Sequence, residues 1–88
     1  YAHESARRLL LEAEPERKPI LGRRERQCLE LIARGKGDFE ISVILGVSEH
    51  TVHNTIRRAM RKFEVATRVQ AFVRALLRGE IRLQDLSD

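Results

Sequence analysis

Apolar side chains recur every three or four residues over most of this 88-residue chain, which is the spacing that gathers them on one face of an α-helix. The pattern is clearest between residues 49 and 63, where one stripe comprises Val52, Ile56, Ala59, Met60 and Phe63. Further helices are predicted over Ala2–Glu14, Arg23–Arg34, Phe39–Leu45 and Arg68–Arg78. We therefore expect an all-α fold, a four-helix domain preceded by a helical extension and a linker.

Proline and glycine residues mark the boundaries between these helices. Pro15 and Pro19 bracket a charged run, and each proline pushes the residue before it out of the helical region. Residues 15–20 are therefore interpreted as a linker, which divides an N-terminal extension (residues 1–20) from a domain (residues 21–88). The glycines that directly follow predicted helices, and that favour a left-handed stop, are Gly35 and Gly79.

The segment from Asp38 to Lys62 has the composition of a helix-turn-helix. Asp38 is a good N-cap for the first of its two helices. Only Gly46, Val47 and Ser48 separate the helices, and they supply a residue able to adopt positive φ, an apolar plug for the corner and a hydroxyl N-cap. So short a connection predicts a tight corner with Gly46 held at positive φ.

The face of the second helix opposite its apolar stripe carries amide, imidazole and guanidinium groups. At about 100° per residue, this outward face comprises His50, Asn54, Arg57 and Arg61, flanked by His53, Arg58 and Lys62. Asn54 can pair with the N6/N7 edge of adenine and Arg57 with O6/N7 of guanine, and both lie in the half of the helix that reaches base edges. The candidate contacts to the DNA backbone are Ser48, Thr51, Arg58, Arg61 and Lys62. For any single arginine, a solvated surface side chain is the competing interpretation.

The charge distribution agrees with binding to a polyanion. The chain carries a net charge of +4, and residues 1–20 and 63–88 each contain equal numbers of acidic and basic side chains. The surplus therefore lies in residues 21–62, as expected for a surface that binds double-stranded DNA. A solvated basic face would give the same pattern.

Several classes of protein do not fit the sequence. Cys28 is the only cysteine, so a disulfide or a cysteine-based metal site is not expected, and the histidines have no second ligand at a suitable spacing. There is no nucleophile–base pair and no phosphate-binding loop, which argues against an enzyme and against a bound cofactor. The absence of a long apolar run or a signal segment, with Tyr1 at the start, predicts a fragment of a longer cytoplasmic protein that does not span a membrane.

The helix predicted over residues 68–78 has two possible roles. Its apolar side comprises Val69, Phe72, Val73, Leu76 and Leu77. Packing into the core is the default role of such a stripe. A self-association surface would follow if the stripe exceeds what so small a core can cover.

Residues 21–83 resemble the LuxR-type, or GerE-type, C-terminal domain. The residues that carry the resemblance are Leu21, Arg24, Glu25, Leu29, Ala33, Gly35, Glu40, Ile41, Leu45, Gly46, Val47, Ser48, Thr51, Val52, Lys62, Val65, Arg68 and Ala71. The resemblance implies a four-helix domain that binds an inverted repeat near a promoter as a homodimer, with the fourth helix as the dimer contact. The positions that match the family's base contacts are His53, Asn54 and Arg57.

Within that family, residues 39–46 and 58–63 are similar to the acyl-homoserine-lactone receptor branch. The similarity implies a quorum-sensing regulator whose ligand is bound by an N-terminal domain outside this chain. Phe39 stands where that branch usually has Trp, which bears on contacts with RNA polymerase. Three further departures are Gly22 for Thr, which removes a hydroxyl cap, Thr55 for His, and Glu64 for Gly. The output domain of a phosphorylation-driven response regulator and a sigma-factor C-terminal domain remain alternatives.

Overall fold

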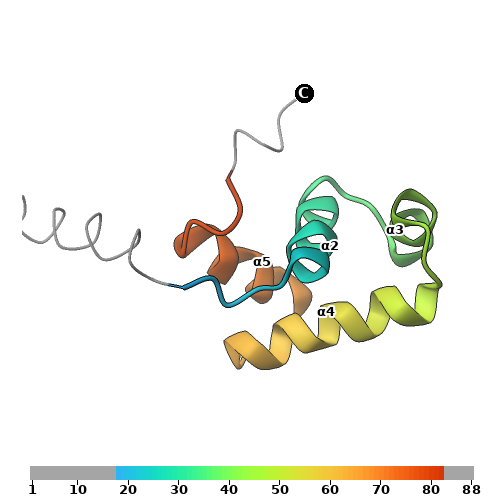
Figure 1. Ribbon diagram of the computed structural model, residues 1–88. Helices are drawn as coiled ribbons and strands as arrows, with labels where there is room; N and C mark the ends of the chain where they lie inside the picture. The colour runs from blue at the N-terminus through green and yellow to red at the C-terminus, as the bar shows by residue number, and fades with distance from the viewer. Residues whose placement is uncertain (1–17, 83–88) are drawn as a thin grey trace, which may run out of the picture.

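The computed structural model describes residues 18–82 of the chain, which form four α-helices and contain no strand (Figure 1). The helices are α2 (Arg23–Ala33), α3 (Asp38–Leu45), α4 (Glu49–Phe63) and α5 (Arg68–Leu77). The predicted all-α fold is confirmed, and the four helices begin and end within one residue of their predicted bounds. The helix predicted over Ala2–Glu14 and the first part of the predicted linker lie outside the described residues.

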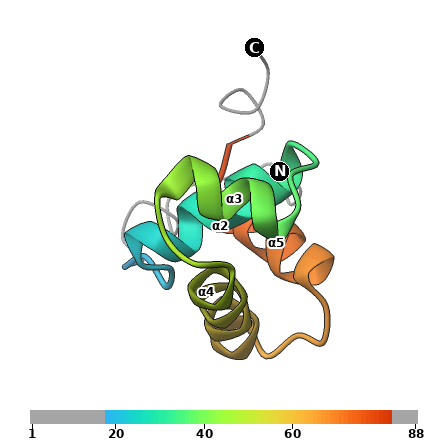
Figure 2. The ribbon, with the colours of Figure 1, turned by 90° about the vertical axis from the view of Figure 1, so that its right-hand side faces the viewer.

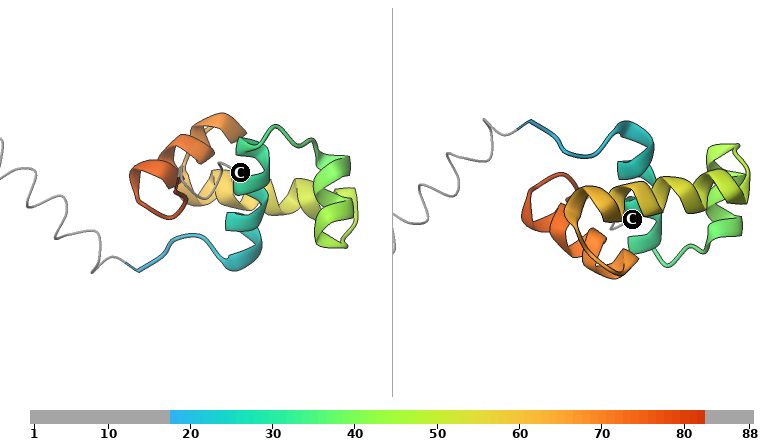
Figure 3. Two further views of the ribbon diagram at one scale, coloured as in Figure 1. Left: turned by 90° about the horizontal axis from the view of Figure 1, so that it is seen from above. Right: turned by 90° about the horizontal axis from the view of Figure 1, so that it is seen from below.

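The longest helix, α4, forms the base of the fold. The other three helices each pack against it, and α2 also contacts α5. Figure 2 looks along α4 and shows the other helices above it, while the view from below in Figure 3 shows α4 in front of them. One side of α4 therefore faces the core and the opposite side is left uncovered by the rest of the domain.

The core consists of two clusters, one at each end of α4. The cluster that joins α4 to α3 has the buried residues Cys28, Ile41, Val52 and Ile56. The cluster that joins α4 to α2 and α5 has the buried residues Leu21, Leu29, Ala59, Phe63, Ala71, Ala75 and Ile81. Ile32 and Met60 pack against both clusters and connect them. The predicted apolar stripe of α4 thus faces the core, as its spacing indicated.

The corner between α3 and α4 has the predicted chemistry. Gly46 has φ 70° and ψ 35°, a left-handed conformation that costs an L side chain about 1 kcal/mol or more. Val47 packs against the apolar cluster at this end of α4. Ser48 is the N-cap of α4, and its hydroxyl accepts a hydrogen bond of 3.0 Å from the Thr51 N–H. The positive φ predicted at Gly46 and the cap predicted at Ser48 are both confirmed.

The start of α3 differs from the prediction that Asp38 is its N-cap. The N-cap is Gly37, whose N–H donates to Glu40 Oε1 at 3.0 Å, and Asp38 is already the first helical residue. The Asp38 carboxylate accepts a hydrogen bond of 2.5 Å from Arg68 Nη1, 30 residues further along the chain. The prediction was wrong because a tertiary ion pair, which local sequence rules do not contain, engages this carboxylate.

Two of the departures from the family pattern have visible consequences. The C-cap of α4 is Glu64, which has φ 55° and ψ 47° and is the one non-glycine residue with positive φ between residues 18 and 82. That conformation explains why glycine is usual at the position, and glutamate there costs about 1 kcal/mol. Gly22, the N-cap of α2, provides no side-chain cap, and its own N–H donates to Glu25 Oε1 at 2.8 Å.

Candidate nucleic-acid interface

The outward face of α4 carries polar side chains that the rest of the domain leaves accessible. On the inner face, Val52, Ile56 and Ala59 are 1% exposed or less. The exposed residues of the outward face are His50, His53, Asn54, Arg57 and Arg61. Seen from below in Figure 3, no other helix crosses in front of this face. The predicted base-contact residues and Arg61 are thus brought together on one free surface, with a length of helix available to enter a groove.

Polar contacts connect this surface to α3 and α5. His53 Nδ1 lies 4.0 Å from Asp38 Oδ2, and Asp38 is itself paired with Arg68. The His53 side chain is 51% exposed, so its imidazole remains accessible to a base edge or a phosphate. Asn54 Nδ2 lies 3.1 Å from His50 Nε2, one turn earlier on the helix. Sequence reasoning did not assign Arg68 a place at this site.

Arg57 has a different environment from the histidines. Its guanidinium makes no hydrogen bond or ion pair with the described residues. It lines a shallow hollow of about 450 Å³ between α4 and the start of α5, together with His53, Ile56, Met60, Ala66, Thr67 and Arg68. An unpaired guanidinium fork can bind the two acceptors of a purine edge without first giving up an ion pair.

The N-terminus of α4 offers a second kind of contact. Ser48 Oγ donates a hydrogen bond of 3.0 Å to Thr51 Oγ1, and both residues are exposed. The first backbone N–H groups of a helix carry partial positive charge and have no partner within the helix. This end of α4 therefore suits a phosphate, as the sequence analysis expected.

Two predicted phosphate contacts, Lys62 and Arg58, are engaged inside the protein. Lys62 Nζ lies 2.7 Å from Glu25 Oε1 and donates to the Ile20 carbonyl at 3.1 Å. Arg58 Nη1 lies 3.8 Å from Glu25 Oε2. The Glu25 side chain is only 4% exposed, so its charge requires these partners. The C-terminal half of α4 is thereby tied to the start of α2.

The sequence contains a signal for the role of Glu25. Glu25 stands on the same side of α2 as Cys28 and Leu29, where the helical period calls for an apolar residue. A carboxylate in a buried stripe needs a cation from elsewhere in the fold. The period therefore predicts that some basic residue is paired with Glu25, although it does not say which one.

A partly buried carboxylate, that of Glu80, binds the backbone of residues 20 and 21, where the chain enters the domain. Its Oε1 accepts hydrogen bonds from the Ile20 and Leu21 N–H groups at 3.1 and 2.9 Å, and its Oε2 accepts one of 2.8 Å from Arg78 Nε. Burial by itself would raise the pKa of the Glu80 carboxyl, but the hydrogen bonds from Arg78, Leu21 and Ile20 outweigh it and lower the pKa below its ordinary value. Residues 20 and 21 are therefore held against the segment that follows α5.

The predicted dimer surface on α5 divides into two groups. Val69, Val73 and Leu77 recur every four residues and are 62%, 43% and 70% exposed. Phe72 and Leu76 are half-buried and pack against the core cluster beneath α5. The helix therefore packs into the core through one group and leaves the other group exposed, because its apolar sector is wider than the core it covers.

A second exposed apolar group lies on α3. It comprises Phe39, Val43 and Ile44, which are 64%, 66% and 53% exposed. The helix is short, and its buried residues are only Ile41 and Ser42. Most of its apolar surface is therefore available to a partner.

Other sites are absent from the described part of the chain. No helix within residues 18–82 is long and apolar enough to cross a membrane. Within the same residues, no group of three or more His, Cys, Asp or Glu side chains is placed to hold a metal ion. Burial raises the pKa of the Cys28 thiol, so the thiolate needed for reaction is disfavoured.

Residues 19–75 match the family described as bacterial regulatory proteins, luxR family. The chain is 44% identical over 72 residues to the spore germination protein GerE of Bacillus subtilis, which is 82% of this chain and 97% of GerE. It is 43% identical over 83 residues to the HTH-type quorum sensing-dependent transcriptional regulator RpaR of Rhodopseudomonas palustris, which is 94% of this chain and 34% of RpaR. A solved structure of the transcription factor GerE superposes with a TM-score of 0.72 at 36% identity, covering 75% of this chain and 98% of that one. The chain thus spans nearly all of GerE but about a third of RpaR.

Proposed function

The chain belongs to the luxR family of bacterial regulatory proteins, and we propose that it recognises a specific inverted-repeat promoter site as a homodimer, as part of a quorum-sensing regulator. Membership of the family makes it the helix-turn-helix DNA-binding domain of a transcription regulator rather than an enzyme. Recognition of one DNA sequence, formation of a homodimer and the response to a quorum signal are proposed for this chain. The observation that carries it is the exposed, unpaired side chain of Arg57 beside Asn54 and His53 on the uncovered face of α4.

In the proposed complex, α4 lies in the major groove and its residues 53–57 read the bases. Arg57 takes a guanine edge, Asn54 an adenine edge, and His53 a neighbouring acceptor through Nε2. The residues proposed to contact phosphates are Ser48, Thr51, Arg58, Arg61 and Lys62. Of these, Lys62 and Arg58 would hold a phosphate at the edge of their existing network with Glu25, since Lys62 is still 37% exposed and Arg58 54% exposed.

The proposed dimer forms along α5. The exposed stripe of Val69, Val73 and Leu77 is apolar and could meet the same stripe of a second copy across a two-fold axis. Phe72 and Leu76 lie beneath it and support it from the core side. A stripe this narrow is well below the area of a stable standard interface, so we expect dimerisation mainly on DNA.

The proposed biological setting is a cytoplasmic regulator that responds to a diffusible signal. RpaR, whose name describes it as quorum sensing-dependent, aligns with 94% of this chain. The ligand would be bound by a further N-terminal domain, and the exposed Phe39, Val43 and Ile44 on α3 would contact RNA polymerase. A phosphorylated receiver domain upstream would instead make the protein a response regulator, which binding assays of the longer protein with acyl-homoserine lactone or acetyl phosphate would distinguish.

The dimer is tested by the spacing of the two half-sites, on a duplex selected from a random-sequence library. Adjacent major-groove half-sites have centres about 10 bp apart, and inserting about 5 bp turns one of them to the far side of the duplex. We expect affinity for the spaced site to fall to that of an isolated half-site. Equal affinity for the two spacings would contradict a symmetric dimer.

Leu77→Glu provides the matching test on the protein. The side chain is 70% exposed, so the fold should keep its thermal midpoint. Binding to the full site should weaken while binding to a half-site duplex stays the same, because only the full site requires the contact between subunits. A parallel loss on both duplexes would place Leu77 at the DNA rather than at the dimer.

A further inference from the structure

A hollow of about 630 Å³ lies on the side of the domain away from the recognition surface. Its described walls come from two regions that are distant in sequence: residues 18–30, which include most of α2, and residues 78–82 after α5. On α2 it is lined by Arg23, Arg26, Gln27 and Glu30. These residues lie on the side of the helix opposite its buried residues Glu25, Cys28 and Leu29. Helix α4 contributes no residue to the lining.

The lining is strongly basic. Among residues 18–82, its cations are Lys18, Arg23, Arg26, Arg78 and Arg82, against the carboxylates of Glu30 and Glu80. Glu80 is already held by Arg78 and two backbone N–H groups. The surplus of positive charge in this hollow is therefore large for a chain whose net charge is +4.

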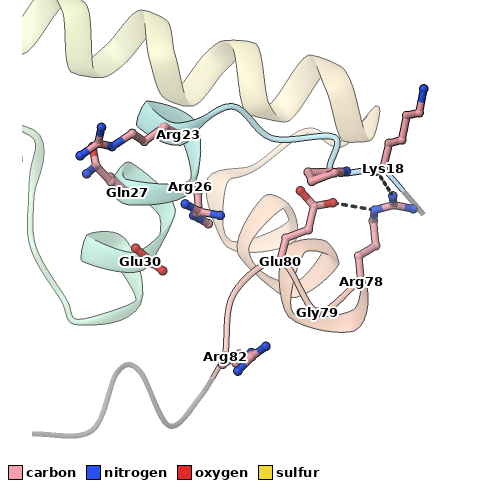
Figure 4. Close-up of a pocket in the computed structure, with 10 residues that line it drawn as sticks. Lys18, Arg23, Arg26, Gln27, Glu30, Arg78, Gly79, Glu80 and Arg82 are labelled. Carbon is pink, nitrogen blue, oxygen red and sulfur yellow. Dashed lines mark hydrogen bonds and ion pairs between the residues drawn. The ribbon is translucent and has the colours of Figure 1, made fainter. Parts of the chain in front are cut away.

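Three of these cations are free to bind a ligand. Arg23, Arg26 and Arg82 are exposed, and their side chains make no hydrogen bond or ion pair within residues 18–82. In Figure 4, Arg26 reaches into the space between α2 and Glu80, Arg82 lies at the lower edge, and the Lys18 ammonium points away. Like charges gathered in a concave site repel one another unless an anion is present.

The frame that holds these arginines is fixed by the fold. Glu80 binds the Ile20 and Leu21 N–H groups, and Arg78 Nη2 reaches the Lys18 carbonyl at 3.4 Å. The entering segment and the end of α5 are therefore joined across one edge of the hollow. A preformed site loses less entropy on binding than one that must be assembled.

We propose that this hollow, which we call the basic hollow, binds an acidic peptide segment of a partner protein while α4 is on DNA. The guanidinium groups match carboxylates by charge and by their bidentate geometry. Within residues 18–82, the lining contains no aromatic residue on which a nucleotide base could stack, and its polar surface suits an extended acidic chain better than an apolar small molecule. Because α4 lies on the other side of α2, the peptide and the DNA do not compete for the same surface.

The experiment measures fluorescence anisotropy of a labelled peptide that alternates Glu and Ser, at low salt, with the full 88-residue chain. The matched Gln/Ser peptide should not bind. The double variant Arg26→Gln/Arg82→Gln should weaken binding of the acidic peptide about fivefold or more. Arg57→Gln/Arg61→Gln removes the same charge from the opposite face and should change the affinity by less than about twofold.

Changes in the amide chemical shifts of the domain show where the peptide binds. We expect shifts in residues 18–30 and 78–82, and little change at residues 50–61. An equal loss of peptide binding in the two double variants, or shifts on α4, would overturn the proposal in favour of general electrostatic attraction. Tighter binding of inorganic triphosphate with the same dependence on Arg26 and Arg82 would reassign the hollow to a phosphate ligand. Shifts in residues 18–30 on adding a DNA duplex would reassign it to a second DNA segment.

Unchanged DNA affinity and an unchanged thermal midpoint are expected for Arg26→Gln/Arg82→Gln, because these side chains are exposed and unpaired among the described residues. A variant that folds and binds DNA but has lost the peptide would assign the defect to the basic hollow. Loss of DNA binding in this variant would contradict the separation of the two surfaces.

Discussion

On α4, the Arg57 guanidinium is exposed and unpaired within the described part of the chain, whereas Lys62, five residues further on, lies 2.7 Å from the carboxylate of Glu25. Both residues are cations on one helix, and both were predicted to contact DNA. They differ because Arg57 has no carboxylate within ion-pair distance among the described residues, whereas Lys62 meets a buried acid near the start of α2. A basic residue on a recognition helix can therefore bind DNA or stabilise the fold, depending on its neighbours.

The comparison separates two measurable properties of the domain. If the unpaired cations of α4 bind DNA and those that meet Glu25 hold the fold, substitutions of the unpaired cations should change DNA binding without changing stability. Substitutions of the cations that meet Glu25 should mainly lower stability. Two predictions test this division and a third tests the carboxylate of Glu80, beginning with the largest effect.

The largest expected effect is the loss of stability when Lys62 is replaced by methionine. Lys62→Met leaves the Glu25 carboxylate, 4% exposed, without its closest cation. Removing one partner of a fully buried ion pair costs about 3–5 kcal/mol. Because the Lys62 side chain is 37% exposed, we expect a smaller loss of about 2–3 kcal/mol in the free energy of unfolding, measured by urea denaturation.

Arg61→Met is the matched control, since it removes one positive charge from an exposed, unpaired position of the same helix turn. Its free energy of unfolding should stay within about 0.5 kcal/mol of the parent chain. Adding Glu25→Gln to Lys62→Met should restore part of the stability, because the unpaired buried charge is then absent. Equal destabilisation by Lys62→Met and Arg61→Met would contradict the claim that Lys62 stabilises the fold by pairing with Glu25.

The second prediction concerns base reading by Arg57. Arg57→Ala should weaken binding to the selected duplex by about ten- to a hundredfold, because a bidentate contact to guanine discriminates by about 1–3 kcal/mol. Binding to a scrambled duplex and the free energy of unfolding should barely change. Isotherms on both duplexes across a salt series measure these quantities.

Arg61→Ala is the counterpart on the same face, one turn further along. It should weaken binding to both duplexes about equally and reduce the slope of log affinity against log salt by about one, as expected for one phosphate contact. If Arg57→Ala also lost affinity in parallel on both duplexes, Arg57 would be only a phosphate anchor. Base reading would then rest on His53, Asn54 or DNA shape.

The smallest expected effect is a change in acid stability when Glu80 is replaced. The folded-state pKa of this carboxyl is lowered, so its contribution to stability is present above the ordinary pKa of 4.5 and is lost as the pH falls through the lower folded-state value. We expect Glu80→Gln to lower the free energy of unfolding by about 1 kcal/mol at pH 7. The difference should shrink steadily below about pH 4.5.

Urea denaturation of both chains between pH 7 and about pH 3 checks this prediction. Since Glu80 fastens residues 20 and 21 and not α4, DNA affinity at pH 7 should remain unchanged. A difference in the free energy of unfolding that is independent of pH would show that the charge of Glu80 does not contribute to stability. Only the shape of the side chain would then contribute.

The local features of this protein followed from its sequence. The helix bounds, the apolar stripe of α4, the positive φ of Gly46 and the Ser48 cap depend on residues within one or two helical turns of each other. Period, side-chain chemistry and short loops act over that range, so the pattern of residues is sufficient to predict them. The outward orientation of Asn54 and Arg57 belongs to the same group, because it follows from the stripe on the opposite face.

The partners of the charged residues were decided only by the tertiary structure. Lys62 and Glu25 are 37 residues apart, Asp38 and Arg68 are 30 apart, and Glu80 meets Leu21 across 59 residues. The surplus charge of residues 21–62 is likewise divided, since Arg23 and Arg26 line the basic hollow and not the DNA-binding face. A linear sequence gives the number and spacing of charges, but a charge is paired or free according to which distant segment packs beside it, and that is fixed only when the helices assemble around α4.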